Sequence, residues 1–452
     1  MKVARREFLG TVGGLAFAQQ QAARKPNMVF LLADDLGFRD LGYQGGPMAT
    51  PHLDRLAREG RVLPRHYTYP LCSPTRSGIM TGRNPMRLGL GYTVVRPWER
   101  RGLPLDETTM PEVFRAAGYR TGMVGKWHLG HWSKAQTPNG RGFDHFYGHV
   151  NGAIDYFTHE RDGGLDWQRN GKSLREEGYT TDLIAAEAVR WMGEGDAAKP
   201  FFLYVPFNSP HSPLQAPERL RGRHADIGDE RRRTFVQMVE AMDEAVGKIV
   251  AQLQKSGQME NTLIAFQSDN GGPRGQGANN GTLRAGKATV YEGGLRVPAF
   301  VHWKGKLEAG EAQGVTTLCD WLPTLVGAAG IPLRAGKPLD GMNVWPQLLA
   351  NNALPGRKDL YFAVEPGTQG VQMALIDGQY KLVRVGAREE LFDVEADPSE
   401  KKDVRSFLPE VATRMSNRLD AWMRLAPKNA LRHSGGAPKG FVAPKEWAEL
   451  AR

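Results

Sequence analysis

The chain has 452 residues, of which 40% are hydrophobic and 24% are charged, and its formal net charge is +10. This composition is typical of a soluble globular protein, no apolar run approaches the roughly 18 residues that a membrane span needs, and the length predicts one large domain with a smaller second one. The positive charge favours anionic partners, but no long run of lysine and arginine interleaved with aromatic residues indicates nucleic acid.

Residues 1–26 are predicted to be an export signal and a linker. Arg5 and Arg6 precede a short, weakly apolar stretch that ends at Ala16-Phe17-Ala18, and this arrangement resembles a twin-arginine signal with its cleavage site. The alternative is a disordered basic tail. The signal predicts a periplasmic or secreted protein that is exported after it has folded.

Four short apolar runs share one pattern: each is apolar on both faces and leads into polar side chains. Such runs suit buried parallel strands, and helical patterns at 110–117, 183–192 and 231–254 separate them. We therefore expect an α/β fold over residues 27–345, with a large, mixed, mostly parallel sheet sandwiched by helices. The runs with their following residues are 29–33 with Asp34 and Asp35, 122–125 with Lys126 and His128, 201–205 with Asn208 and His211, and 263–266 with Asp269 and Asn270.

These strand ends predict one polar site. Ligands of open α/β sheets bind beyond the carboxyl ends of the strands, so the side chains that follow the four runs should converge there. The alternative is that loops after strands are simply polar. That alternative does not explain why these loops hold carboxylates, imidazoles and a lysine rather than serine, glycine and proline.

Residues 346–425 are predicted to form a smaller C-terminal α+β domain that carries an antiparallel sheet. Two of its strands would form a hairpin around the turn Asp377-Gly378. The tail, 426–452, shows no clear periodicity and is assigned no function. The expected elements of the domain are strands at 360–364, 372–376 and 380–385 and a helix at 411–425.

The most specific motif begins at Cys72 and follows the pattern Cys-x-Pro-x-Arg. Pro74 suits the first turn of a helix, so Cys72 would lie at a positive helix N-terminus, where bound anions are favoured. The alternative is a buried structural cysteine. Two cysteines, Cys72 and Cys319, cannot form a disulfide framework for a chain of this size. The motif is Cys72-Ser73-Pro74-Thr75-Arg76-Ser77-Gly78-Ile79-Met80-Thr81-Gly82.

A second motif spans residues 118–128 and ends in Lys126-Trp127-His128. With these two motifs, the chain resembles the type I, formylglycine-dependent sulfatases of the alkaline phosphatase superfamily. Within that family it is most similar to the branch of arylsulfatase B, an N-acetylgalactosamine-4-sulfatase. That branch is rich in disulfides and this chain is not, so its substrate-recognition loops need not match. Further stretches that resemble this branch are 50–54, 103–107, 141–144, 214–218 and 320–325.

The resemblance implies that a formylglycine-generating enzyme oxidises Cys72 to formylglycine (3-oxoalanine). One hydroxyl of the aldehyde hydrate would attack sulfur and expel the alcohol, forming a sulfo-enzyme intermediate. The second hydroxyl would then lose its proton and release sulfate by C–O cleavage. Arg76 would help to neutralise the sulfate.

The resemblance also assigns the other catalytic side chains. Lys126 would bind a sulfate oxygen, and His128 would hold the hydrate and act as the base of the elimination. His211 and Lys287 would touch the sulfate and the bridging oxygen, where either residue could be the general acid.

A cation site is implied by the same resemblance. Every expected ligand is an oxygen donor, which favours calcium, and magnesium less strongly, and no cysteine and histidine cluster suggests zinc. Taken alone, the pair Asp34-Asp35 could be a helix cap. The expected ligands are Asp34, Asp35, Asp269, Asn270 and one hydrate oxygen of residue 72.

The resemblance therefore implies hydrolysis of sulfate esters, on sulfated sugars or polysaccharides. One alternative is a phosphatase or phosphonate monoester hydrolase of the same superfamily, although a doubly charged phosphate would benefit from a second metal. A non-catalytic protein that binds sulfated glycans is the other alternative, and unconverted Cys72 would produce it. The sequence does not identify the sulfated alcohol.

Overall fold

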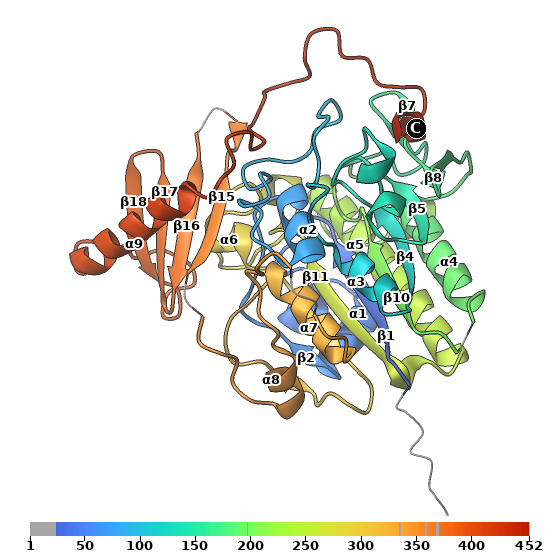
Figure 1. Cartoon of the computed structure of the whole chain (residues 1–452), viewed down its shortest axis with the longest axis horizontal. Helices are drawn as coiled ribbons and strands as arrows, with labels where there is room; N and C mark the ends of the chain where they lie inside the picture. Colours follow the sequence, from blue (N-terminus) through green and yellow to red (C-terminus); the bar gives the residue numbers. More distant parts are fainter. Residues whose placement is uncertain (1–23, 197, 334–335, 358, 368–369, 452) are drawn as a thin grey trace, which may run out of the picture.

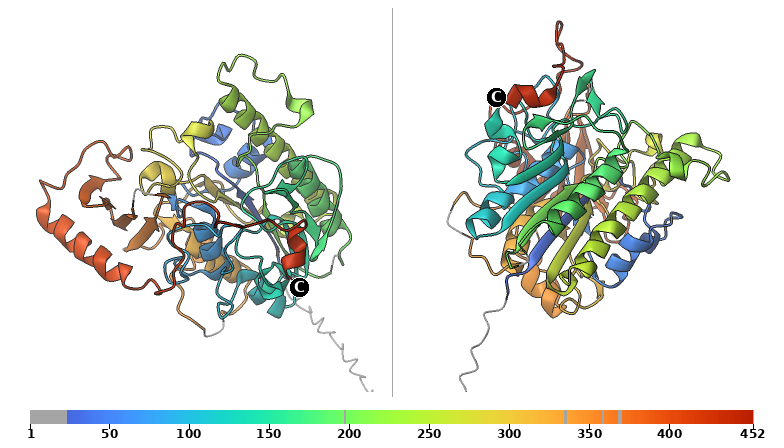
Figure 2. Two further views of the ribbon diagram at one scale, coloured as in Figure 1. Left: turned by 90° about the horizontal axis from the view of Figure 1, so that it is seen from above. Right: turned by 90° about the vertical axis from the view of Figure 1, so that its right-hand side faces the viewer.

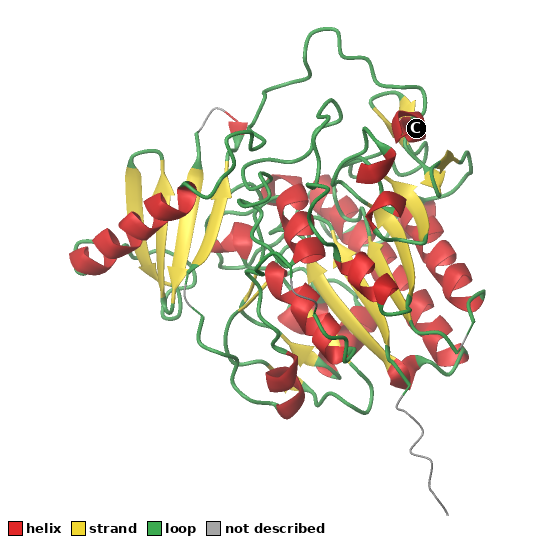
Figure 3. Cartoon of the chain, viewed as in Figure 1, coloured by secondary structure: helices red, strands yellow, loops and turns green. Residues whose placement is uncertain are grey.

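A computed structural model describes residues 24–196, 198–333, 336–357, 359–367 and 370–451 (Figure 1). Within these ranges the strands form a large ten-stranded sheet and a separate four-stranded sheet, and helices pack against both (Figure 3). The strands of the large sheet, in spatial order, are β13 (Gly310–Glu311), β2 (Arg61–Val62), β12 (Ala299–His302), β11 (Thr262–Ser268), β1 (Asn27–Ala33), β10 (Phe201–Pro206), β4 (Arg120–Lys126), β5 (His145–His149), β8 (Gln168–Arg169) and β9 (Lys172–Ser173).

The centre of the large sheet is parallel. β1 pairs in parallel with β11 on one side and β10 on the other, and β4 and β5 continue the parallel order beyond β10. β12 and β8 flank this centre as antiparallel strands. The prediction of a mixed, mostly parallel sheet is therefore confirmed, and the carboxyl ends of its central strands meet at one edge.

β1 shows why the apolar runs lack a polar face. Met28, Phe30 and Leu32 pack into the core on one side of the sheet, whereas Val29 and Leu31 pack into the core on the other. Both sides are covered by helices, so both faces of the strand must be apolar (Figure 2). One layer contains α1 (Pro51–Arg58), α4 (Thr180–Gly193) and α5 (Glu230–Lys255), and the other contains α2 (Cys72–Thr81), α3 (Met110–Ala116), α7 (Trp321–Ala328) and α8 (Trp345–Ala350).

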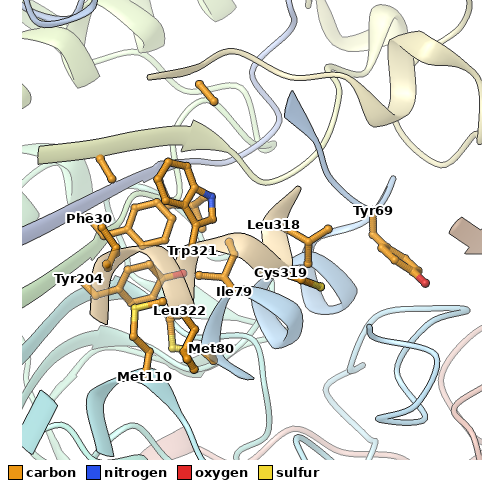
Figure 4. Close-up of a cluster of buried hydrophobic side chains, with 14 of the residues drawn as sticks. Phe30, Tyr69, Ile79, Met80, Met110, Tyr204, Leu318, Cys319, Trp321 and Leu322 are labelled. Carbon is orange, nitrogen blue, oxygen red and sulfur yellow. The ribbon is translucent and has the colours of Figure 1, made fainter. Parts of the chain in front are cut away.

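Helix α2 is anchored on the sheet by a cluster of buried side chains (Figure 4). Ile79 and Met80 of this helix pack with Trp321 of α7, and the Trp321 ring lies 5.1 Å from the ring of Phe30 on β1. Burial of large apolar side chains on this scale holds the whole helix in place. The cluster therefore fixes the N-terminus of α2, where Cys72 lies.

The four-stranded sheet is an antiparallel meander with α9 (Pro409–Met423) packed on one face. The predicted hairpin is confirmed, because Asp377 pairs with Tyr380 across its turn. A fourth strand at 388–393 was not predicted, since its first half, Arg388-Glu389-Glu390, is charged. The strands are β15 (Leu360–Val364), β16 (Gln372–Asp377), β17 (Tyr380–Val385) and β18 (Arg388–Asp393).

After α9 the chain returns to the large unit, arching across the top of the view in Figure 1. On the way Arg432 pairs with Glu365, just after β15 of the small sheet, and beyond it Phe441 packs edge-to-face on Trp98 of the large unit. The segment ends in a 3-10 helix, η9 (Trp447–Ala451), whose Trp447 is fully buried. The tail thus docks on the large unit although its sequence has no periodicity.

Short elements complete the fold, and none of the described helices has the length and apolar character to cross a membrane. The twin-arginine motif predicted at Arg5 and Arg6 lies outside the described residues. The short elements used below are α6 (Glu292–Leu295) and the pairs β3 (His66–Tyr67) with β14 (Thr316–Thr317) and β6 (Glu160–Arg161) with β7 (Gly164–Leu165).

Candidate active site

Cys72 is the first residue of α2, as the position of Pro74 predicted. Its thiol lies 3.5 Å from Oδ1 of Asp34 and is buried. Burial, together with the negative charges of Asp269 and Asp34, raises the pKa of the thiol. An unmodified Cys72 is therefore held as a neutral thiol and is a poor nucleophile.

The acidic residues come from neighbouring strands. Asp34 and Asp35 follow β1, and Asp269 and Asn270 follow β11, whose Ser268 is in register with Ala33. The backbone N–H of Asp35 donates to Oδ1 of Asp269 at 3.2 Å, and the Asn270 amide donates to Oδ1 of Asp35 at 2.8 Å. Asp35 has a φ of 73°, which is a strained backbone conformation for a residue other than glycine. Strain of this kind is common at functional sites, where the surrounding structure enforces it.

Arg76 lies one turn after Cys72 and contacts both Asp269 and Lys126. Its Nε and Nη2 donate to Oδ2 of Asp269 at 3.0 and 2.9 Å, and its Nη1 donates to the backbone oxygen of Lys126 at 2.8 Å. The Arg76 side chain is fully buried. Its guanidinium therefore ties the start of α2 to the ends of β11 and β4.

Two lysines reach the aspartates after β1. Lys126, at the end of β4, donates to Oδ2 of Asp34. Lys287 donates to Oδ2 of Asp35 at 2.8 Å, and although burial alone lowers the pKa of Lys287, the charge of Asp35 raises it overall. The Lys287 ammonium therefore stays charged near neutral pH.

The two predicted histidines make different contacts. The ring of His211 has Nε2 at 3.6 Å from Oδ2 of Asp35 and Nδ1 at 2.6 Å from the backbone oxygen of Ser212. His128 has Nε2 at 3.0 Å from the backbone oxygen of Val95. Among the described residues, Nδ1 of His128 has no hydrogen-bond partner.

His128 is held in an unusual conformation. Its φ is 62°, and its ring packs so closely on Gly152 that a Cβ at that position would lie 2.4 Å from the ring. Burial and the charges of Lys126 and Arg76 lower the pKa of His128 well below its ordinary value. The imidazole is therefore neutral and able to accept a proton.

The carboxylate and amide oxygens of this cluster suit a hard divalent cation. Ligand atoms of Asp34, Asp35, Cys72 and His211 lie within 4.8 Å of one another. Oδ1 of Asn270 is buried without a hydrogen-bond partner among the described residues, although a buried amide oxygen normally has one. Carboxylate and amide oxygens are the ligands that calcium and magnesium prefer.

Charge counting supports the same conclusion. Among the described residues of this cluster, the carboxylates and the cationic side chains are equal in number, so the protein groups are close to neutral. A divalent cation would leave a positive site, which a sulfate ester anion would help to neutralise. The carboxylates are Asp34, Asp35 and Asp269, and the cations are Arg76, Lys126 and Lys287.

All ten predicted site residues therefore come together at the carboxyl edge of the sheet. His149 joins them without having been predicted: it is the last residue of β5, in register with Lys126, and it is fully buried. Both of its ring nitrogens lack a hydrogen-bond partner among the described residues. A fifth strand ending in a histidine was the signal, but His145 and Gly148 interrupt the apolar run.

Comparison with known proteins identifies the family. The family model described as "Sulfatase" matches residues 26–331. Arylsulfatase J of Mus musculus is 36% identical over 76% of this chain and 58% of its own length. N-acetylgalactosamine-6-sulfatase of Mus musculus is 33% identical over 84% of this chain and 75% of its own length, and arylsulfatase A of Homo sapiens is 34% identical over 87% and 80%.

Solved structures agree with the sequence comparison. The structure of Ps i-CgsB in complex with k-i-k-neocarrahexaose is 33% identical, with a TM-score of 0.85 over 91% of this chain and 95% of that one. The PsFucS1 sulfatase from Pseudoalteromonas sp. is 27% identical, with a TM-score of 0.75 over 91% and 92%. With its fold, its clustered strand ends and these relatives taken together, the chain belongs to the sulfatase family.

Proposed function

We propose that this protein hydrolyses sulfate esters of sugars, with Cys72 as the precursor of its nucleophile. The observation that carries the proposal is the convergence on one buried point of Cys72, Arg76 and the carboxylates that follow β1 and β11. The same cluster holds lysine and histidine side chains suited to binding an oxyanion and moving protons.

Conversion of Cys72 to formylglycine supplies a hydrate with two hydroxyls on one carbon, one to attack sulfur and one to release sulfate by C–O cleavage. The neighbouring side chains have distinct tasks. Arg76 and Lys126 bind the sulfate oxygens and offset their charge. Since Nε2 of His128 donates to a backbone oxygen, Nδ1 carries the lone pair and accepts the proton that the release step frees.

The departing alcohol must receive a proton, and Lys287 and His211 are the candidates. Both side chains contact the same carboxylate, that of Asp35. Lys287 is held charged, whereas burial and the charge of Lys287 lower the pKa of His211. Substituting Lys287 and His211 one at a time identifies the general acid. Loss of the general acid slows hydrolysis of sulfates with poor leaving groups far more than hydrolysis of activated aryl sulfates.

A calcium ion fits the oxygen donors better than magnesium, because calcium tolerates irregular geometry. Asp34, Asp35, Asp269 and Asn270 would hold it together with residue 72. When bound, the ion supplies positive charge that polarises the oxygens in the site. The donor set gives no reason to expect zinc.

Sulfated polysaccharide or its fragments are the proposed substrate. One relative is named for N-acetylgalactosamine 6-sulfate, and one similar structure contains a neocarrahexaose. Maturation by a formylglycine-generating enzyme and twin-arginine export to the periplasm or beyond complete the proposal. The export motif at residues 5–6 supports the second of these.

The direct test compares rates on 4-nitrophenyl sulfate and 4-nitrophenyl phosphate after production with a formylglycine-generating enzyme. Mass spectrometry of the peptide that contains Cys72 reports conversion, which lowers the peptide mass. We expect the sulfate rate to dominate and Cys72→Ala to abolish it. A dominant phosphate rate would assign the protein to the phosphatases, and an intact thiol in fully active enzyme would remove Cys72 as the nucleophile.

A further inference from the structure

Arg96 lies beside the proposed nucleophile. The residue before it, Val95, is clamped at both ends of its peptide unit: its N–H donates to Oγ of Ser73 at 3.0 Å, and its oxygen accepts from Nε2 of His128 at 3.0 Å. Because Ser73 directly follows Cys72, these bonds hold the backbone of Arg96 at the edge of the site. The guanidinium of Arg96 lies near the side chain of Cys72.

The guanidinium of Arg96 is half-buried and has no partner. Within the described residues, no carboxylate lies within ion-pair distance of it and its side chain makes no hydrogen bond. By contrast, Arg76 in the same site makes hydrogen bonds to Asp269 and to a backbone oxygen. A partly buried, unpaired guanidinium is costly, so its presence beside the site favours a ligand that supplies the missing negative charge.

A second arginine lies near the first. Burial and the positive charge of Arg161 both lower the pKa of Arg96, so the two guanidinium groups repel each other. Arg161 is the last residue of β6, and its Nε lies 3.3 Å from the carboxylate of its neighbour Asp162. Two cations that approach each other this way form a ready site for an anion.

The docked tail holds both arginines. The indole N–H of Trp447 donates to the backbone oxygen of Arg161 at 3.0 Å, and its ring packs edge-to-face on His131 with centroids 5.4 Å apart. The same His131 has Nε2 at 3.0 Å from the oxygen of Pro97, the residue after Arg96. Trp447 and His131 therefore brace the two arginine-bearing segments against each other.

We infer that Arg96 and Arg161 bind a second anionic group of the substrate, next to the ester that reacts at residue 72. This inference rests on the proposed function and adds a substrate class: glycans that carry a further sulfate or a carboxylate near the scissile sulfate. Guanidinium groups suit either group, because each presents paired oxygens for bidentate hydrogen bonds.

The experiment measures kcat/KM for three sugars that share one scissile sulfate: one with no other charge, one with a second sulfate on the same residue, and one with a carboxylate on the adjoining sugar. We expect the wild type to prefer a doubly anionic sugar. Arg96→Gln should lower kcat/KM for that sugar about 10- to 100-fold, mainly through KM, and should erase the preference. Which anionic sugar loses more identifies the bound group.

The matched control is Arg414→Gln, which removes the same charge from the exposed face of α9 and should leave the preference intact. Equal losses of kcat/KM on all three sugars would overturn the inference. They would show that Arg96 serves only the reaction or the fold and does not bind a second anionic group. A wild type without any preference would overturn it as well.

Failure of the proposed function is recognised separately. If converted wild type desulfates none of the sugars, binding of the doubly anionic sugar is measured by calorimetry in Cys72→Ala protein, with and without Arg96→Gln. A weaker affinity in the double variant would support the anionic subsite even then. Unchanged affinity would remove the subsite.

Discussion

The ammonium of Lys381 lies 2.9 Å from Oε1 of Glu292 and 2.9 Å from Oε1 of Glu400, and all three side chains are buried. Lys381 belongs to the four-stranded sheet, whereas Glu292 begins α6, just after the loop that carries Lys287. The backbone N–H of Glu292 also donates to Glu400 at 2.7 Å. The small sheet is thus joined by a buried ion pair to the segment that holds a proposed catalytic lysine.

Lys381→Met is expected to destabilise the protein by about 3–5 kcal/mol, because it leaves two buried carboxylates without their cation. Urea unfolding of the variant and the wild type measures the change. Lys401→Met, at an exposed position, is the control and should change stability little. Adding Glu400→Gln to Lys381→Met should recover part of the loss, and no recovery would contradict the ion-pair explanation.

Calcium removal should lower both activity and thermal stability. Because the proposed ligands come together only in the folded protein, adding calcium to chelated enzyme should raise Tm by mass action. Asp269→Asn should weaken this response strongly, since it removes the negative charge of a proposed ligand that also pairs with Arg76. Differential scanning calorimetry with calcium, magnesium or zinc makes the comparison, and a Tm that responds best to zinc would contradict the oxygen-donor site.

Gly152→Ala should lower kcat while leaving the protein folded. A methyl group at residue 152 would lie 2.4 Å from the His128 ring and push it away from its bond to Val95. Steady-state kinetics on 4-nitrophenyl sulfate should show a fall in kcat of about 100-fold or more, the size expected when a positioned base is lost. Gly275→Ala is the control, because nothing lies within 4 Å of an added Cβ there. Equal effects of both variants would dismiss the role of His128.

Asp243 makes stability depend on pH. Its buried carboxylate accepts hydrogen bonds from the backbone of His52 and Leu53, and burial raises its pKa to about 7. The folded protein thus binds a proton more tightly than the unfolded chain does. The stability contribution is fully present below the unfolded pKa near 3.8 and is lost as the pH rises through 7.

Relative to Asp243→Asn, the wild type should gain stability as the pH falls from 7 to 5, by about 1 kcal/mol for each pH unit. Urea unfolding at both pH values tests this gain. Asp226→Asn, at an exposed position, should show no such trend. A difference between wild type and Asp243→Asn that is constant with pH would refute the raised pKa.

The centre of the fold was predictable because a strand that is buried on both faces appears in the sequence as a short run of apolar residues. The middle residues of β1, β4, β10 and β11 carry no polar side chain except the hydroxyl of Tyr204 in β10, and the polar residues that follow had to meet at one edge. The outer strands were not predictable. β2 and β8, for example, have two residues each, too few to show any periodicity, and they form because neighbouring strands offer free backbone groups.

The site was predictable where the residues lie in motifs and not where they depend on packing. Lys126 and Arg76 belong to recognisable patterns. Arg96 belongs to none, and its proximity to Cys72 follows from two backbone hydrogen bonds of Val95. Trp447 was missed for the same reason, because its burial depends on partners far away in the chain.

The burial of α2 bears on whether Cys72 is oxidised before or after the protein folds. Cys72 is only 2% exposed, and every residue from Cys72 to Thr81 is buried with it. An enzyme that oxidises this cysteine must bind the peptide around it, and that peptide is inaccessible in the folded protein. On the proposed function, oxidation of Cys72 would therefore have to precede folding, and molecules that fold first would remain inactive thiols. In a host short of the oxidising enzyme, faster synthesis would yield more protein of lower specific activity.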